Sequence, residues 1–170
     1  AKPQIFNMSM TWVGGSKEAV APILNENRLF ITPSGNDFPE PVDQNKCDSV
    51  VIPVGSLSPV GAPSNFSQQS PCVTISAPSD NYITSKVHGK EVKFGGTSGA
   101  APLVTGAMTN ALCLLPNLSD EEGKLLLKGT AIRTLASHGE PPTNGAGMLN
   151  ALLIVKVSER IKKLCGNDLS

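Results

Sequence analysis

The sequence has no long apolar run, few aromatic residues and no excess of charge of either sign. No apolar stretch reaches the roughly 18 residues that a membrane-spanning helix needs. Lysine plus arginine and aspartate plus glutamate number 14 each, so the formal net charge is zero. This balance offers no basic patch for nucleic acid and no acidic tail typical of disorder. We therefore expect neither nucleic acid nor a membrane as a partner.

The sequence also lacks a zinc-type cysteine pattern. The spacings of Cys47, Cys72, Cys113 and Cys165 match no set of metal ligands, and we expect no metal and no cofactor. Cys113 lies in an apolar helical pattern and is expected in the core. Cys47 and Cys72 lie in predicted loops, and their spacing leaves a bridge between them open. The redox compartment therefore stays open as well.

The start of the chain shows neither an initiator methionine nor a signal peptide. It opens Ala1-Lys2-Pro3-Gln4 and runs directly into a strand-like stretch, as a processed or truncated start would. The 170 residues suffice for one domain with a core. The 16 glycines and 14 prolines indicate many tight turns between short elements.

Short apolar stretches predict four β-strands, over residues 4–9, 28–32, 49–56 and 72–77. The first of these, around Ile5–Met8, is expected at or near an unpaired edge of the sheet, where it would favour self-association or contact with a partner. Alternating residues on both sides of His88-Gly89 predict an exposed hairpin over residues 82–94.

Helical patterns alternate with these strands. They cover residues 16–24, about 98–115, 119–129 and about 149–164. Hydrophobic strands that alternate with helices are typical of a parallel sheet covered by helices. We therefore predict an α/β fold, in which ligands bind beyond the carboxyl ends of the strands.

The stretch Gly95-Gly96-Thr97-Ser98-Gly99-Ala100-Ala101-Pro102 stands directly before the longest helical pattern. A serine in the first turn of a helix has a backbone N–H with no helical acceptor, at the positive end of the dipole. That position suits a nucleophile whose oxyanion the helix start would hold. A helix-capping serine is the alternative interpretation, although a cap explains neither the glycines nor the proline.

Several motifs in the expected order resemble the subtilisin-like serine peptidases, or subtilases. Gly96-Thr97-Ser98 with Ala100 and Pro102 resembles the nucleophile motif of that family, and Ser34-Gly35-Asn36 resembles its oxyanion-asparagine loop. Asn7-Met8-Ser9 is similar to the strand end that lines the substrate cleft. Further similar stretches are Val51-Ile52 with Val54-Gly55, Asn65-Phe66-Ser67, Ser76-Ala77-Pro78 and residues 145–151. The match covers nearly the whole chain.

The resemblance implies a role for each matching residue. Ser98 would attack the scissile carbonyl, while the Asn36 amide and the Ser98 N–H would hold the oxyanion. A polypeptide substrate would add as a strand in a groove between two walls. The substrate-binding residues implied are Ser9, Met10 and Thr11 on one side, Thr32, Pro33, Ser34 and Gly35 on the other, and Thr97.

The aspartate and histidine motifs of the family are absent from this sequence. His88 falls at a predicted hairpin tip and His138 in a loop, and neither is expected to act as the base. A serine without a base is a poor nucleophile at neutral pH. We therefore expect the C-terminal half of a subtilase domain over residues 1–170, inactive alone, with the Asp and His supplied upstream or by another chain. The alternative is a non-catalytic module that binds peptides or proteins.

Smaller departures concern specificity and location. Met10-Thr11-Trp12 replaces a sequence of the Leu-Gly-Gly type, which leaves the pocket shape open. Asp37 after Asn36 is interpreted as a simple loop acid. The related acid-acting sedolisins carry an aspartate in the oxyanion hole, so Asn36 favours the neutral or alkaline family. Secretion is common among subtilases and is implied here by analogy alone.

Overall fold

A computed structural model describes residues 4–10, 28–80, 82–134 and 143–166. The helix expected over residues 16–24 lies outside the described residues, as do Thr11 and His138. Within the described ranges, none of the helices combines the length and the apolar character needed to cross a membrane.

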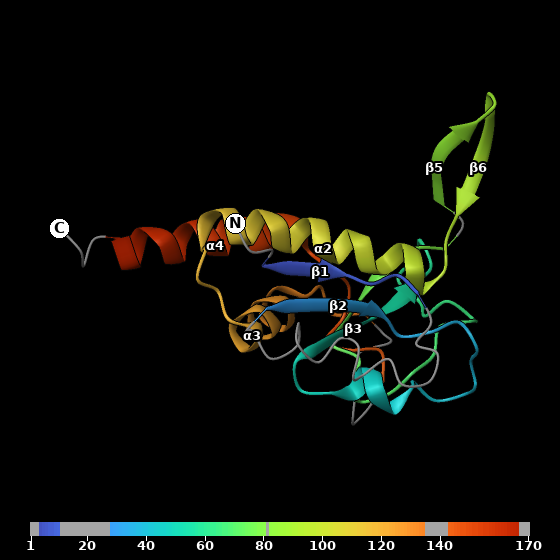
Figure 1. The fold of residues 1–170 in the computed structure, drawn as a ribbon, viewed down its shortest axis with the longest axis horizontal. Helices are drawn as coiled ribbons and strands as arrows, with labels where there is room; N and C mark the ends of the chain where they lie inside the picture. Colours follow the sequence, from blue (N-terminus) through green and yellow to red (C-terminus); the bar gives the residue numbers. More distant parts are fainter. Residues whose placement is uncertain (1–3, 11–27, 81, 135–142, 167–170) are drawn as a thin grey trace.

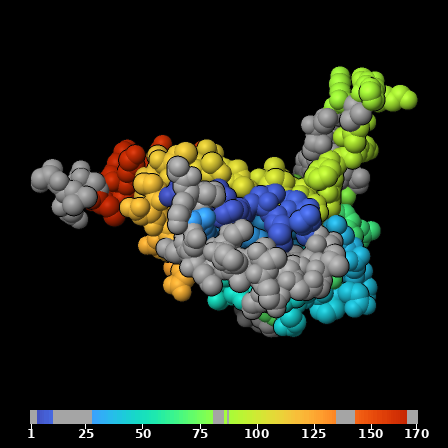
Figure 2. Space-filling view, viewed as in Figure 1, coloured from blue at the N-terminus to red at the C-terminus, as the bar shows by residue number. Residues whose placement is uncertain are grey.

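In the part of the chain that the structure describes, the centre of the fold is a parallel sheet of four strands in the order β1-β2-β3-β4. These strands are β1 (Ile5–Asn7), β2 (Leu29–Pro33), β3 (Val51–Leu57) and β4 (Ile75–Pro78). Each pairs in parallel with the next along the chain, which confirms the predicted α/β class. Within the described residues β1 is an edge of this sheet, as expected, and in Figure 2 it is visible at the surface below α2.

The two faces of the sheet differ in what they bury. Side chains alternate between faces along a strand, so Leu29 and Ile31 of β2 point to one side and Phe30 to the other. Leu29 and Ile31 belong to the main core, whereas Phe30 packs with Val51 in a small separate cluster. The main core therefore lies between the sheet and the helices.

Three helices supply the other half of that core. They are α2 (Thr97–Leu114), α3 (Asp120–Thr130) and α4 (Ala151–Gly166). α2 packs along the sheet and contacts every one of its strands, with α4 beside it (Figure 1). Its buried positions Val104, Met108 and Ala111 recur at helical spacing and face the strands. α3 begins as the sequence predicts, with a capping box between Ser119 and Glu122.

The predicted hairpin is present and projects from the body of the molecule (Figure 1). It consists of β5 (Tyr82–Val87) and β6 (Lys90–Phe94), which pair antiparallel. His88 and Gly89 form its turn, both with positive φ, at 49° and 77°. β6 leads directly to the start of α2.

The cysteines separate into a pair and two free thiols. Cys47, at the end of the short 3-10 helix η1 (Gln44–Cys47), forms a disulfide with Cys72 across 25 residues. Cys113 and Cys165 are free and exposed. The core position expected for Cys113 is therefore wrong: Leu112 and Met108 turn toward the sheet, and Cys113 is rotated away from that face.

Candidate active site

Ser98 occupies the second residue of α2 and is half-buried. The N-cap of the helix is Gly96, which makes no side-chain capping bond, so the capping interpretation of Ser98 is wrong and the first-turn placement is confirmed. Pro102 has no N–H to offer the Ser98 carbonyl four residues earlier. As the second residue of the helix, Ser98 has a backbone N–H with no acceptor inside the helix.

Asn36 is held against the start of the same helix by its side-chain carbonyl. Asn36 Oδ1 accepts a hydrogen bond from the Thr97 backbone N–H at 2.9 Å and another from Thr97 Oγ1 at 2.8 Å. A backbone N–H can only donate, so this contact identifies the Asn36 atom that accepts as the oxygen. The Nδ2 group then stands on the other branch of the amide, available as a donor.

Glycine is required at two points of this contact. Gly96 has a φ of +78°, and a Cβ built on it would lie 3.2 Å from Asn36 Nδ2. Gly35 has a φ of +127° and donates its N–H to Thr97 Oγ1 at 3.2 Å. The asparagine loop (residues 34–36) and the helix start are thus joined through Thr97, which is fully buried.

Two residues, Gln68 by its backbone and Lys46 by its side chain, support the asparagine loop from behind. Gln68 donates its backbone N–H to the Gly35 carbonyl at 2.9 Å, and its Nε2 binds the Pro41 carbonyl at 2.7 Å. Lys46 of η1 donates its Nζ to the Ser34 carbonyl at 3.4 Å and is only 4 % exposed. Burial lowers the pKa of Lys46, and the charges of Asp43 and then Asp37 oppose that shift.

The residues expected to wall a substrate groove differ in their exposure to solvent. Met10 is 61 % exposed and Ser9 half-buried, at the point where the chain leaves the edge of the sheet. Thr32, Pro33 and Ser34 are buried, and the N–H and carbonyl of Ser34 already bond to Val54 and Lys46. The roles of these residues, and of Gly35 and Thr97 as substrate contacts, stay predictions.

A cavity of about 450 Å³ adjoins the start of α2 at Gly95 and Gly96. Its other walls come from the loop after β3, including Ser58, Ser64 and Phe66, and from Asp80. His88 is exposed at the hairpin tip, which is the placement that the sequence predicts for it. Within the described residues, Gly96 thus lies between this cavity and Asn36 of the asparagine loop.

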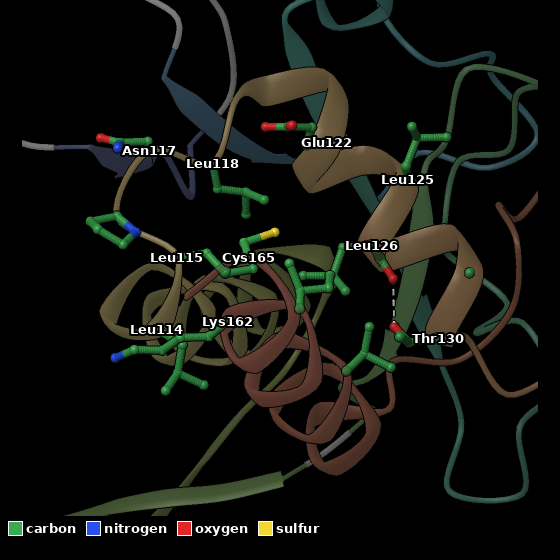
Figure 3. Close-up of a pocket in the computed structure, with 14 residues that line it drawn as sticks. Leu114, Leu115, Asn117, Leu118, Glu122, Leu125, Leu126, Thr130, Lys162 and Cys165 are labelled. Carbon is green, nitrogen blue, oxygen red and sulfur yellow. Dashed lines mark hydrogen bonds between the residues drawn. The ribbon is translucent and has the colours of Figure 1, made fainter. Parts of the chain in front are cut away.

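A larger groove lies at the opposite end of α2. It encloses about 670 Å³ between the end of α2, α3 and α4. Leucines dominate its wall, among them Leu118, Leu125 and Leu126, with Glu122 and Lys162 as its charged members (Figure 3). Among the described residues, no group of three histidine, cysteine, aspartate or glutamate side chains could hold a metal there or elsewhere.

Lys46 and Gln68 are the site residues that sequence reasoning missed. Both stand in stretches whose polar residues and prolines predict loops, where a lysine or glutamine is normally a solvated surface residue. Only the folded chain shows that they reach the backbone of the asparagine loop. The chain spacing offers no signal for either contact.

The carboxyl ends of the parallel strands thus bring an amide-bearing loop to a serine at a helix start, and this arrangement defines the class of the protein. The sequence profile of the subtilase family, Peptidase_S8, matches residues 1–152. The chain belongs to the subtilase family.

Two curated relatives are serine or alkaline proteases by name. The halolysin-like extracellular serine protease Nep of Natrialba magadii is 30 % identical over 127 residues, which are 75 % of this chain and 23 % of that protein. The thermostable alkaline protease of Halalkalibacterium halodurans is 27 % identical over 150 residues, 86 % of this chain and 40 % of that protein. The chain therefore spans less than half the length of these relatives.

Solved structures share the fold. The PatG macrocyclase domain matches with a TM-score of 0.72 and 23 % identity, over 91 % of this chain and 51 % of that one. A cold adapted subtilisin-like serine proteinase matches with a TM-score of 0.66 and 25 % identity, over 86 % of this chain and 54 % of that one. These matches confirm the subtilisin-like parallel sheet.

Proposed function

We propose that this chain is the serine-bearing C-terminal part of a subtilase peptidase domain and that the complete domain hydrolyses peptide bonds. Ser98 is the nucleophile, and the Asn36 Nδ2 group with the Ser98 N–H forms the oxyanion hole. The observation that carries this proposal is the fixed orientation of Asn36, whose Oδ1 is occupied by Thr97 so that Nδ2 is left to donate.

In the proposed reaction Ser98 Oγ attacks the scissile carbonyl and passes its proton to a base. The tetrahedral oxyanion accepts hydrogen bonds from Asn36 and from the Ser98 backbone. The C–N bond then breaks, the leaving amine takes the proton from the base, and water releases the acyl group from Ser98. The base and its carboxylate partner come from a part of the domain outside residues 1–170, so the isolated chain is inactive.

The substrate is a polypeptide bound next to the asparagine loop. The end of β2 at Thr32 and Pro33, continued by Ser34, forms one wall of its groove, and Ser9 and Met10 after β1 form the other. Thr11, which lies outside the described residues, is expected on the side of Ser9 and Met10 from the family resemblance alone. The missing part of the domain is also the partner proposed for the β1 edge, and self-association is the alternative occupant. Sedimentation velocity separates these two: a monodisperse monomer at high concentration would exclude self-association.

A fluorophosphonate probe tests the nucleophile directly. The full-length protein that contains this chain should be labelled, and its Ser98→Ala variant should not. The variant should also hydrolyse a peptide substrate with a kcat at least about 10³-fold lower than that of the parent. Ser119→Ala is the matched control, because Ser119 is also a helix-start serine but only caps its helix. Labelling that survives in Ser98→Ala would refute the proposed nucleophile.

The alternative function is a non-catalytic module that binds peptides, motivated by the absent base. Labelling of the isolated 170-residue chain at Ser98 would contradict that alternative. Peptide binding by a full-length protein that neither reacts with the probe nor hydrolyses peptides would support it.

A further inference from the structure

Lys46 is a buried cation behind the asparagine loop. Its side chain is 4 % exposed, and its Nζ lies 3.4 Å from the carbonyl oxygen of Ser34. Lysine is almost never buried to this degree without a partner, because removing an ammonium group from water is costly. A surface lysine would serve a merely structural loop equally well, so the burial itself calls for a physical reason.

The contact with Lys46 is the first in a continuous chain of hydrogen bonds. The carbonyl that Lys46 binds belongs to the Ser34–Gly35 peptide, and the N–H of that same peptide donates to Thr97 Oγ1 at 3.2 Å. Thr97 Oγ1 in turn donates to Asn36 Oδ1 at 2.8 Å. This series of hydrogen bonds therefore runs from the Lys46 ammonium group to the Asn36 amide, which carries Nδ2.

The direction of every bond in this chain is determined by the groups themselves. An ammonium group and a peptide N–H only donate, and a carbonyl oxygen only accepts. Thr97 Oγ1 accepts from Gly35, which leaves its own proton for the Asn36 oxygen. No choice of hydrogen position or amide orientation can reverse the order.

Such an order polarises each group in the same sense. A cation at the Ser34 carbonyl draws electrons from the peptide and makes the Gly35 N–H a stronger donor. A hydroxyl that accepts a stronger bond donates one more strongly, and an amide whose oxygen accepts it carries more positive charge on its NH₂ group. The final group in the chain is the Asn36 Nδ2 donor.

We propose that Lys46 is a positioning residue for the reaction, which strengthens and orients the Asn36 oxyanion donor through Ser34–Gly35 and Thr97. The inference rests on the proposed function of Ser98 and Asn36. The cation is retained at this position by its neighbours: Asp43 caps the helix that carries Lys46, and the disulfide of Cys47 anchors the same helix. Burial lowers the pKa of Lys46, and the charges of Asp43 and Asp37 oppose that shift in favour of the ammonium form.

Kinetics of the full-length protein on a chromogenic peptide amide test the proposal. Lys46→Met keeps the length of the side chain and removes the cation. It should lower kcat about three- to tenfold, a fraction of what losing an oxyanion donor costs, and change KM by less than about twofold. Lys46→Arg keeps the charge and should restore kcat to within about twofold of the parent.

A double-mutant cycle distinguishes the chain of bonds from general support of the loop. Thr97→Val removes the hydroxyl in the middle of the chain, so Lys46→Met should lower kcat no further in that background. Thr97→Ser keeps the hydroxyl and should preserve the full effect of Lys46→Met. Equal losses from Lys46→Met in the Thr97→Val and parent proteins would overturn the proposal, as would an unchanged kcat in the parent.

Lys124→Met is the matched control for removing a partly buried lysine. Burial also lowers the pKa of Lys124, but that residue lies on α3, away from the asparagine loop. Its kcat should equal that of the parent, and melting temperatures should show that all variants fold. A loss in Lys124→Met as large as in Lys46→Met, or in Lys46→Arg as large as in Lys46→Met, would contradict a specific role for the cation.

An NMR readout keeps this test separate from the proposed function. In protein labelled with ¹⁵N-glycine, Lys46→Met should move the Gly35 amide proton upfield, and Lys124→Met should leave it in place. An unmoved Gly35 signal would overturn the inference whatever the enzyme does. Conversely, hydrolysis that persists in Ser98→Ala would refute the proposed function whether or not the Gly35 signal moves.

Discussion

The two ends of α2 carry opposite kinds of surface. At its first residues, Thr97 joins the helix to Asn36 by directional hydrogen bonds, beside a cavity of about 450 Å³. At its last residues, leucines of α3 with Val157 and Ile161 of α4 border a groove of about 670 Å³ whose wall is mainly apolar. The larger hollow thus lies away from the proposed nucleophile and oxyanion donor.

This difference indicates which property of the protein a substitution at each end of α2 should change. A donor that must meet an oxyanion loses its value with a small displacement, because hydrogen bonds weaken steeply with angle. Dispersion contacts in an open groove are individually small and are largely exchanged for water contacts. Substitutions at the start of α2 should therefore affect rate, and replacing an exposed side chain of the groove should affect neither rate nor stability by much.

The largest effect is expected for Asn36→Ala in the full-length protein. It removes the Nδ2 donor, and kcat should fall by about 10²–10³, the range known for removing the corresponding donor from a subtilisin, a relative of this chain. Asn117→Ala is the control at the other end of α2, where an exposed asparagine lines the groove. A kcat unchanged by Asn36→Ala would break the comparison at its chemical end.

Glycine substitutions at the two ends should have opposite signs. Gly96→Ala places a Cβ 3.2 Å from Asn36 Nδ2 at a φ of +78°, and should cost about 1–3 kcal/mol of unfolding free energy. Gly129 lies in α3 and lines the groove, and a Cβ added there meets no atom within 4 Å. Gly129→Ala should therefore raise the unfolding free energy by about 0.5–1 kcal/mol. Urea unfolding measures both, and destabilisation by Gly129→Ala would contradict the open packing there.

Ser119→Ala should cost about 1 kcal/mol at neutral pH by removing the cap of α3. Hydrogen bonds from the backbone and side chain of Ser119 lower the pKa of Glu122 in the folded chain. A carboxyl with a lowered folded pKa stabilises the fold above its ordinary pKa of 4.5 and loses that contribution as the pH falls through its folded pKa. The difference between parent and variant should therefore shrink below about pH 4.5, measured by urea unfolding across pH; a constant difference would exclude the charge of Glu122 as its source.

The smallest effect is expected for Leu125→Ser in the groove. Leu125 is 69 % exposed, so its replacement should change the unfolding free energy by no more than about 0.5 kcal/mol and leave kcat unchanged. Leu127→Ala, two residues on and fully buried, should cost about 2–5 kcal/mol and serves as the reference. A fall in kcat with Leu125→Ser would show that the groove takes part in function.

Sequence reasoning reached the elements with strong local signals. The apolar runs of β2 and β3 predict buried strands, and Ser119 with Glu122 predicts the start of α3, because these signals are complete within a few neighbouring residues. It failed at Cys113, whose helix is apolar around most of its surface. In such a helix the buried face is chosen by what packs against it, and the local pattern does not show which side that is.

The candidate site divides in the same way. Ser98 and Asn36 stand in short motifs that can be read along the chain. The network that joins them through Thr97, Gly35 and Lys46 spans residues far apart in the sequence. Hydrogen bonds over such separations depend on distances that only the packed strands bring about.

By itself, the sequence determined that this chain is a parallel-sheet α/β protein with a subtilase serine motif before a long helix. Only the tertiary structure decided that the Asn36 carbonyl is occupied by Thr97, which leaves the amide to donate, and that Lys46 is buried behind the same loop. The physical reason is that apolar periodicity and capping act between neighbours along the chain. The orientation of a donor is instead set by partners from three separate segments, which meet only once the sheet has formed.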